Sequence, residues 1–481
     1  MIRRIACLVA ALAVTACGGG GSSKPCDAVA QTGCATGQFC ETKLAATAGA
    51  PSTTACFAPV LIEGSVVDPT TASTSGSVTP LNDARVVALD DNRAPVSTVA
   101  VSAGTGTSAG TYQLAVRAVR DSTGKPVQAN VTLRADRQGY QPFPGGIRTA
   151  LPIGLSAAVN TSGSWVVSSP LTALQLLPIG SGAGQSSVHG LVNGLPSGSG
   201  ALIVAEPVGG GFGLTGIADS SGAYAIYNLQ TGTQYVITAY VKGMNYAPVT
   251  TPSLPSGDTT LNALQPAAGT GATLAGGLIF NSAPSTSIEV ALVVKSTYDA
   301  NLDRGETPPG LTVAGTSSGY SFAGVPDGSY VVLAPFGLTG DIRDVSGTGN
   351  TAAPYVTILN GAVQGTPPGF KITSAVDLVS IGGTPVGATP TVVTTPTPDF
   401  IWQSQPAYSS AASYQITVFD SFGNIVWGPL SQAAVSGTNQ VTYKGPANVG
   451  MPYQLRIQAL AGSGAQLSQT EDLAGVFVYQ P

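Results

Sequence analysis

The sequence predicts an all-β chain in which tandem Greek-key β-sandwiches follow a small N-terminal segment stapled by disulfides. Three observations carry this prediction. Glycine (62) and proline (35) are dense among the 481 residues, and both break long helices. Short apolar and β-branched runs alternate with turn residues, which is typical of strands. The same order of runs recurs three times, which indicates repeated modules.

Residues 1–16 have the pattern of a secretory signal peptide, with a basic start and an apolar run too short to persist as a spanning helix. The segment from Val14 to Cys17 resembles a bacterial lipobox. This resemblance implies that Cys17 is acylated, with palmitate among its chains, and several acyl chains anchor a protein more firmly than one. Residues 17–25 follow as a Gly/Ser tether. An ordinary signal peptide with an incidental cysteine is the alternative.

Gly18 follows the lipobox cysteine. By resemblance to the sorting rule of some Gram-negative bacteria, a glycine there, in place of an aspartate, favours the outer membrane. The sequence leaves open whether the protein faces the periplasm or the exterior.

Residues 26–58 contain four cysteines, an even number in an exported chain. This pattern predicts two disulfides that hold a segment too small to build its own core. Three pairings are compatible with the sequence. A four-cysteine zinc site is the alternative, but the Cys-x-x-Cys pairs typical of such sites are missing. The four cysteines are Cys26, Cys34, Cys40 and Cys56.

Three repeats occupy residues 60–179, 185–267 and 272–381. Each has an opening strand around a glycine, a second apolar strand, and a glycine turn just before a tyrosine. The opening glycines are Gly64, Gly190 and Gly276, and the tyrosines are Tyr112, Tyr224 and Tyr320. The second strands are Ala84 to Leu89, Ala201 to Ala205 and Ile288 to Val294. Each copy has the size of an immunoglobulin-like sandwich.

Residues 219–229 and 319–330 resemble the carboxypeptidase regulatory-like domain. The resemblance implies a seven-stranded Greek-key sandwich of the immunoglobulin-like or prealbumin-like type, and it implies no peptidase activity. The first repeat departs from the family pattern, because an insert from Asp121 to Gln128 replaces a short turn.

The C-terminal part differs from the repeats. Residues 382–398 read as a Thr/Pro linker, and residues 399–481 resemble a fibronectin type III domain. This second resemblance implies that Trp402 and Tyr453 face the core and that Arg456 faces outward. Pro/Gly linkers between the modules predict an extended stalk.

The composition argues against catalysis and against nucleic acid as a partner. His189 is the single histidine, so a histidine-ligated zinc centre within the chain is excluded. Ser108 and Ser317 lie in Gly-x-Ser-x-Gly patterns, but both precede the same repeat strand and read as turns. No catalytic residue is therefore predicted. Charged residues make up 9% of the chain, its net charge is −5, and it has no basic run that would bind phosphates.

Two weaker site predictions remain. Asp299, Asn301 and Asp303 place oxygen donors at alternate positions, as calcium loops do, although a solvated Asp/Asn turn is the favoured interpretation and no other cofactor is expected. Tyr140 and Tyr246 lie beside prolines, as in some sugar- or peptide-binding loops. Closure of one sandwich end is the favoured interpretation of these tyrosines.

The sequence as a whole predicts a non-enzymatic, membrane-anchored lipoprotein. Its expected role is surface display, adhesion or envelope scaffolding, with the lipid membrane as a partner through Cys17. The alternative is a lipoprotein that binds a polysaccharide or peptide through its sandwich loops. The protein or polysaccharide that it contacts in the envelope or outside the cell is not predicted.

Overall fold

The computed structural model describes residues 26–72, 78–180, 184–281, 283, 285–334, 338–343, 354–367 and 369–481. These residues form strands and short 3-10 turns, so the all-β prediction is confirmed. Residues 1–25, with the proposed signal peptide and Cys17, lie outside the described part. Within that part, no helical segment has the length and apolar character needed to cross a bilayer.

The cysteine-rich segment is a hairpin that extends a sheet of the first repeat. Strand β1 (Phe39–Lys43) pairs antiparallel with β2 (Thr53–Phe57), and Cys40 lies opposite Cys56. β1 also pairs in parallel with β8 (Val119–Arg120), which forms a hairpin with β9 (Pro126–Gln128). The insert noted in the sequence forms the turn and the second strand of this hairpin, and the cysteine-rich segment pairs with β8, which lies just before the insert.

The first module is a sandwich around one apolar core. One sheet has the order β13-β14-β3-β15 with β4 and β7 added to β3, and the other has the order β12-β10-β5-β6. β11 and β16 form a separate pair. The strands are β3 (Val60–Asp68), β4 (Thr79–Pro80), β5 (Arg85–Leu89), β6 (Ala100–Val101), β7 (Thr111–Val116), β10 (Asn130–Asp136), β11 (Tyr140–Gln141), β12 (Ile153–Gly154), β13 (Val159–Thr161), β14 (Ser164–Val167), β15 (Ala173–Gln175) and β16 (Leu177–Pro178). The 3-10 turns are η1 (Pro69–Thr71), η2 (Gly106–Ser108), η3 (Leu155–Ala157) and η4 (Pro170–Thr172).

The second module packs a three-stranded sheet, β20-β17-β24, against a four-stranded sheet, β19-β18-β21-β23. A short pair, β22 with β25, completes it. The strands are β17 (Ser186–Leu191), β18 (Ala201–Pro207), β19 (Leu214–Ala218), β20 (Ala223–Leu229), β21 (Tyr235–Tyr240), β22 (Met244–Tyr246), β23 (Val249–Thr250), β24 (Gly257–Thr260) and β25 (Pro266–Thr270).

The third module contains the sheets β26-β30, β27-β35-β32 and β29-β28-β31-β33-β34. Its elements are β26 (Ala272–Gly276), β27 (Leu278–Phe280), β28 (Ser287–Val294), η5 (Lys295–Thr297), β29 (Thr312–Thr316), β30 (Tyr320–Val325), β31 (Gly328–Leu333), β32 (Asp341–Arg343), β33 (Tyr355–Leu359), β34 (Ala362–Gln364) and β35 (Phe370–Ser374).

The fourth module has the sheets β37-β36-β39-β42 and β38-β45-β43-β40-β41, with β44 added to β43. Residues 382–398, expected as a linker, contain β37 and β38. Its elements are β36 (Asp377–Ile381), β37 (Thr384–Pro385), β38 (Thr391–Val393), β39 (Asp399–Gln403), η6 (Pro406–Tyr408), β40 (Ser413–Asp420), β41 (Ile425–Ala433), β42 (Thr438–Thr442), β43 (Pro452–Leu460), β44 (Gln466–Gln469) and β45 (Val476–Tyr479).

The structure explains why glycine and tyrosine recur together in the repeats. In all three, the glycine of the opening strand lies directly opposite the tyrosine of a neighbouring strand. A Cβ atom added to Gly64 would lie 2.6 Å from the hydroxyl oxygen of Tyr112, and one added to Gly190 would lie 2.8 Å from that of Tyr224. The glycine therefore leaves room for the ring of the buried tyrosine. The register pairs are Gly64 with Tyr112, Gly190 with Tyr224, and Gly276 with Tyr320.

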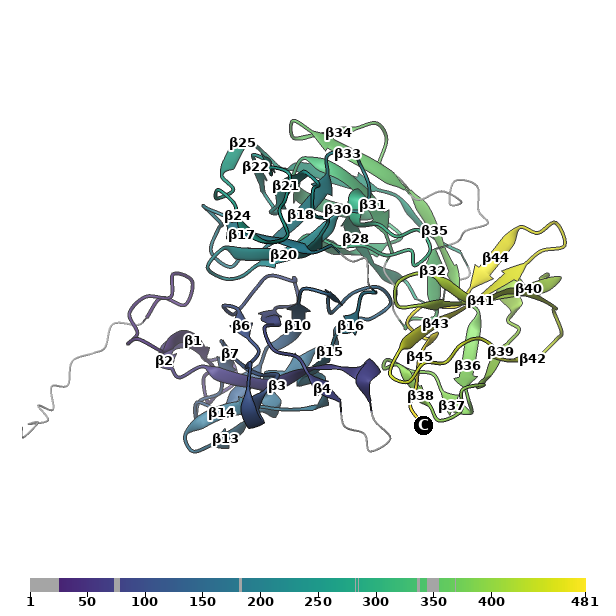
Figure 1. Ribbon diagram of the computed structural model, residues 1–481, viewed down its shortest axis with the longest axis horizontal. Coiled ribbons are helices and arrows are strands. Elements are labelled where there is room, and N and C mark those ends of the chain that lie inside the picture. The colour runs from purple at the N-terminus through teal and green to yellow at the C-terminus, as the bar shows by residue number, and fades with distance from the viewer. Residues whose placement is uncertain are drawn as a thin grey trace, which may run out of the picture.

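The modules pack against one another, which contradicts the expected stalk (Figure 1). One apolar cluster joins side chains of the first, second and third modules, and we call this contact the three-module interface. The members from the first two modules are Val87, Leu89, Leu202, Val204, Ile217 and Tyr240, and the third module contributes its own core, including Val290, Leu292 and Tyr330.

Strands β5 and β18 each contribute to two cores. In β18, Ala201, Ile203 and Ala205 point into the core of the second module, whereas Leu202 and Val204 point into the three-module interface. In β5 the same division holds, because one face belongs to the first module and Val87 and Leu89 belong to the interface. The apolar runs without alternation follow from this burial on both faces.

Side chains of the fourth module contact the first and third. Gln141 donates a hydrogen bond to the carbonyl oxygen of Ser421 at 2.6 Å. Trp402 and Tyr453 are buried as expected. The outward position expected for Arg456 is wrong, because this side chain pairs with Asp472 at 2.9 Å and donates to the carbonyl oxygen of Asn301 at 2.8 Å. The third module covers the surface that Arg456 would otherwise present to water.

Candidate functional site: a groove between the first and second modules

A groove with a volume of about 930 Å³ lies between the first and second modules. One wall is the outer face of the sheet β20-β17-β24, and the other is formed by β5, β6 and the turn that follows β10. This volume is in the range of small-molecule sites in proteins. The groove contains His189, the one histidine of the chain.

Four polar side chains form a hydrogen-bonded ladder on the second-module wall. Strands β17 and β24 pair in parallel, with Ser187 opposite Asp258 and His189 opposite Thr260. Side chains two residues apart share a face of a strand, so all four point into the groove. Ser187 donates to Asp258 Oδ1 at 2.9 Å, His189 Nδ1 lies 2.7 Å from Asp258 Oδ2, and His189 Nε2 lies 2.8 Å from Thr260 Oγ1.

The partners of His189 define its hydrogen-bonding pattern. A carboxylate only accepts, so Nδ1 carries the hydrogen, and Nε2 forms the hydrogen bond with the hydroxyl of Thr260. The order hydroxyl, imidazole and carboxylate is also that of a catalytic triad. Here, however, the side chains of His189 and Asp258 are 44% and 58% exposed, and Thr260 lies on a regularly paired strand. The three groups form a solvated ladder.

The first-module wall is held by contacts to the second module. Arg85 donates to the carbonyl oxygens of Ile217 at 3.1 Å and Ala223 at 2.5 Å. Burial lowers the pKa of Arg85, while the nearby carboxylates of Asp136 and Asp219 oppose that shift. These bonds fix the width of the groove at one end.

Two residues after β10 complete the first-module wall. The guanidinium of Arg137 lies 4.7 Å from the centre of the Tyr140 ring, and its Nε donates to the carbonyl oxygen of Asn82 at 2.6 Å. Gln138 donates to the carbonyl oxygen of Gly184 at 2.5 Å and accepts from the backbone N–H of Asn228 at 3.0 Å. The wall is therefore preorganised by both modules.

The two tyrosines proposed from the sequence have structural contacts. Tyr140 lies in β11 at the contact with the second module, where Asn228 donates to its carbonyl oxygen at 2.9 Å. Its hydroxyl lies 3.4 Å from Asp68 Oδ2. Tyr246 is 6% exposed and donates to the carbonyl oxygen of Asn193 at 2.9 Å. The ring of Tyr246 thus offers little surface to a ligand, and binding through these tyrosines stays a prediction.

The proposed calcium loop lies at the contact between the third and fourth modules. Asp299 Oδ1 accepts from the backbone N–H of Asn301 at 2.8 Å, and Asp303 Oδ1 accepts from the hydroxyl of Tyr298 at 2.5 Å. Leu302, between them, packs with Ile147, Phe419 and Val476. These contacts account for the loop without an ion, and calcium binding there stays a prediction.

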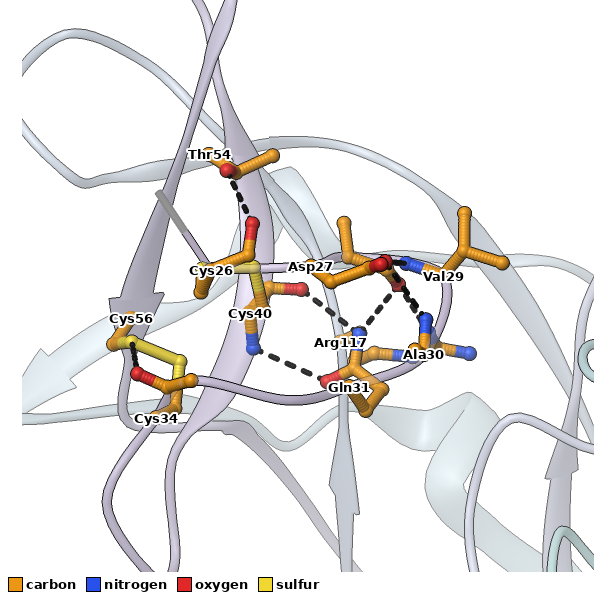
Figure 2. Close-up of a disulfide and its surroundings, with 12 residues drawn as sticks. Cys26, Asp27, Val29, Ala30, Gln31, Cys34, Cys40, Thr54, Cys56 and Arg117 are labelled. Carbon is orange, nitrogen blue, oxygen red and sulfur yellow. Dashed lines mark hydrogen bonds between the residues drawn. A yellow bond between two sulfur atoms is a disulfide. The ribbon is translucent and has the colours of Figure 1, made fainter. Parts of the chain in front are cut away.

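The four cysteines of the N-terminal segment form two disulfides, as expected (Figure 2). The bonds are Cys26–Cys40 and Cys34–Cys56, which resolves the three pairings that the sequence allows. Glu41, between them in the hairpin, forms a buried ion pair with Arg120 of the first module. The segment is therefore attached to the first module by a buried charge as well as by sheet pairing.

Ser108 and Ser317 lie in exposed turns before β7 and β30. The hydroxyl beside His189 belongs instead to Thr260. Sequence reasoning missed this contact because His189 and Thr260 are 71 positions apart and meet only through parallel pairing.

Comparison with known proteins gives likeness in structure alone. No protein-family model matches the chain, and no curated protein matches it. A streptococcal ancillary pilin aligns at 11% identity and a TM-score of 0.16, over 65% of this chain and 98% of the pilin. The Bacillus anthracis TIE protein aligns at 10% identity and a TM-score of 0.14, over 81% and 68%.

A protein from Bacteroides uniformis that is named as a candidate carbohydrate-binding protein aligns at 9% identity and a TM-score of 0.15, over 60% of this chain and 95% of that one. At such identities and scores, nothing about binding is transferred from any of the three. The chain is an all-β protein of several sheets with a disulfide-linked N-terminal segment.

Proposed function

We propose that the chain is a non-enzymatic, lipid-anchored protein of the cell envelope. Its lipid is attached at Cys17, and the outer membrane is its location. The described modules form one body for surface display, adhesion or envelope scaffolding. Carboxypeptidase regulatory-like repeats and a fibronectin type III-like module remain part of this proposal.

The three-module interface is the observation that carries the proposal of a rigid display body. Leu202 and Val204 of β18 are fully buried although they point out of their own sandwich. Removing such side chains from water favours a fixed contact between the modules. A rigid body on a Gly/Ser tether presents one constant surface, whereas a chain of freely jointed modules would present many.

Labelling with palmitate tests the anchor. The full chain expressed in a Gram-negative host should incorporate labelled palmitate and fractionate with the outer membrane. The variant C17S should lose both properties while its described modules keep their thermal unfolding. Incorporation of label into C17S would contradict the proposed anchor, and fractionation of the unaltered chain with soluble periplasmic protein would contradict the location.

The absence of catalysis is a separate part of the proposal. It is supported by the exposure of His189 and Asp258, because a catalytic acid that orients a histidine is normally buried. We expect the full chain to show no hydrolysis of p-nitrophenyl esters above the rate of free imidazole. Turnover that disappears in T260V would contradict this part.

Binding of a polysaccharide or peptide is the second candidate function, and the groove favours it. The groove combines preorganised polar side chains with apolar residues, as ligand sites do. It lies between modules, which differs from the sandwich loops expected from the sequence. Isothermal titration of the full chain against oligosaccharides and peptides tests this candidate, and absence of heat with every probe would remove it.

A further inference from the structure

We infer that the groove between the first and second modules binds a neutral oligosaccharide through its hydroxyl groups. The inference rests on the binding role proposed above as the second candidate, and it assigns both the site and the ligand class. The observations that carry it are the hydrogen-bonding character of the two walls, their balance of charge, and the apolar side chains at the rim.

The polar ladder on the second-module wall mainly accepts hydrogen bonds. The hydrogen on His189 Nδ1 and the hydroxyl hydrogen of Ser187 are used by Asp258, and His189 Nε2 is occupied by its hydrogen bond with the hydroxyl of Thr260. What remains free for a ligand is acceptor capacity, namely lone pairs on the carboxylate and on the two hydroxyl oxygens. A ligand that contacts the ladder must therefore donate hydrogen bonds.

The groove also contains hydrogen-bond donors, and the first is Arg137 on the first-module wall. Arg137 uses Nε and Nη2 on Asn82, and no hydrogen bond from its Nη1 is found within the described residues. The hydroxyl of Tyr227 in β20 of the second-module wall, on the same face as Ala225 and half-buried in the groove, is a second donor. A ligand near these two groups must accept hydrogen bonds. A sugar hydroxyl does both, because it donates one hydrogen bond and accepts up to two.

The charges in the groove balance and so favour a neutral ligand. Arg85 and Arg137 line one wall, and Asp83 and Asp258 line the groove with them. A phosphate or polycarboxylate would meet the carboxylates and the acceptor ladder, and a polyamine would meet two guanidinium groups. Neither kind of ion gains a net attraction from this set of charges.

Exposed apolar side chains lie at the rim of the groove. Val101 of β6 is 60% exposed and Leu191 of β17 is 48% exposed, and both line the groove. The C–H faces of a pyranose ring are apolar, so these side chains would cover the ring faces while the walls bind the hydroxyls. Val101 and Leu191 come from different modules, so a ligand that contacts both lies across the boundary between the modules.

Isothermal titration of the purified full-length protein tests the inference. The probes are neutral hexasaccharides (cellohexaose, maltohexaose, mannohexaose and chitohexaose), the acidic trigalacturonate, and the peptides pentalysine and pentaglutamate. We expect at least one neutral hexasaccharide to bind, and the charged probes to give no heat. The isosteric variants T260V and D258N should each weaken that binding roughly five- to tenfold.

T250V is the matched control, because Thr250 is an exposed strand threonine of the same module outside the groove. It should bind as the unaltered protein does, and thermal unfolding of every variant shows that the fold is kept. Binding that survives both T260V and D258N would overturn the groove as the site and leave the binding role intact. Heat with a charged probe alone would overturn the ligand class, and no heat with any probe would overturn the inference and the binding role together.

Discussion

The two sheets of the second module have opposite environments on their outer faces. The sheet that contains β18 is covered, because Leu202, Val204 and Ile217 lie in the three-module interface. The sheet that contains β17 is open, and its outer face carries His189, Asp258 and Thr260. One module thus uses one face for assembly and the other for a polar surface.

A covered outer face and an open outer face can be distinguished in the sequence. The covered strand begins Ala-Leu-Ile-Val-Ala, with no polar residue before Glu206, whereas β17 reads Ser-Ser-Val-His-Gly-Leu with His189 on the side opposite to the core. An uninterrupted apolar strand in a sandwich predicts a neighbouring module. An alternating strand predicts water or a ligand on its outer face.

The largest expected effect comes from a charge placed in the covered face. V204D would bury a carboxylate without a partner in the three-module interface, and we expect destabilisation by more than about 4 kcal/mol. Urea unfolding followed by circular dichroism measures the loss, and small-angle scattering should show an expanded particle. A V204D protein that unfolds at the unaltered urea concentration would show that this face is not covered.

The second-largest effect is expected at the buried ion pairs of Arg134. Arg134 of β10 is buried and contacts Asp136 at 3.0 Å and Glu306 of the third module at 3.3 Å. Burial alone would lower the pKa of Arg134, but the two carboxylates outweigh burial and raise the pKa. R134M leaves both carboxylates without this partner, and we expect a loss of about 3–5 kcal/mol in the free energy of unfolding.

A triple variant sharpens the Arg134 prediction. R134M combined with D136L and E306M replaces the whole buried group by apolar side chains, and it should recover most of the lost stability. The measurement is the same urea titration. If R134M alone unfolds like the unaltered protein, the three modules are not held through this site.

The contact between the third and fourth modules should depend on pH. Burial raises the pKa of Glu471 from 4.5 to about 7, although the backbone N–H groups of Thr339 and Gly340 donate to its carboxylate and oppose the shift. The folded state therefore holds the proton more tightly than the unfolded state. Stability is greatest below the unfolded pKa and falls as pH rises from 4.5 to about 7.

We expect the ionisation of Glu471 to lower the free energy of unfolding by on the order of 2 kcal/mol as the pH rises from about 5 to about 8. Urea titrations at these two pH values measure the change in the free energy of unfolding. The variant E471Q should remove most of that change. If the pH dependence of stability is unchanged in E471Q, other titrating groups cause it.

The smallest effect is expected on the open face. L191S exchanges a half-exposed side chain that lies outside the three-module interface, so the free energy of unfolding should change by less than about 0.5 kcal/mol. Differential scanning calorimetry of L191S and V204D measures the two changes in stability side by side. A large loss of stability in L191S would show that the outer faces of both sheets are covered, which would contradict the difference between the two sheets.

The all-β fold, the disulfide-stapled segment and the repeat were predictable because each depends on local chemistry. Turn glycines, β-branched runs and closely spaced cysteines act within a few tens of residues. The glycine in each opening strand and the buried tyrosine opposite it were also visible, although their direct pairing was not. The predicted stalk is wrong because β5 and β18 each contribute to two cores, and an apolar run in the sequence does not show whether one or both of its faces are covered.

The groove was not predictable for a different reason. Its walls come from two modules, and its ladder joins His189 to residues about 70 positions away through a parallel strand pair. Polar residues at alternate positions in Ser187 and His189, and again in Asp258 and Thr260, were the available signal. These residues can be recognised as one site only when the register between β17 and β24 is known, and the sequence pattern does not reveal that register.

The double use of β18 also bears on how the chain reaches its folded state. The outer face of this strand is covered by residues that precede it, such as Val87, and by residues about 90 positions later, such as Val290 and Leu292. The second module cannot bury that face until the third module has been synthesised and has folded. Until then the chain exposes an apolar strand face, and its need for a chaperone that holds unfolded chains is greatest at that stage.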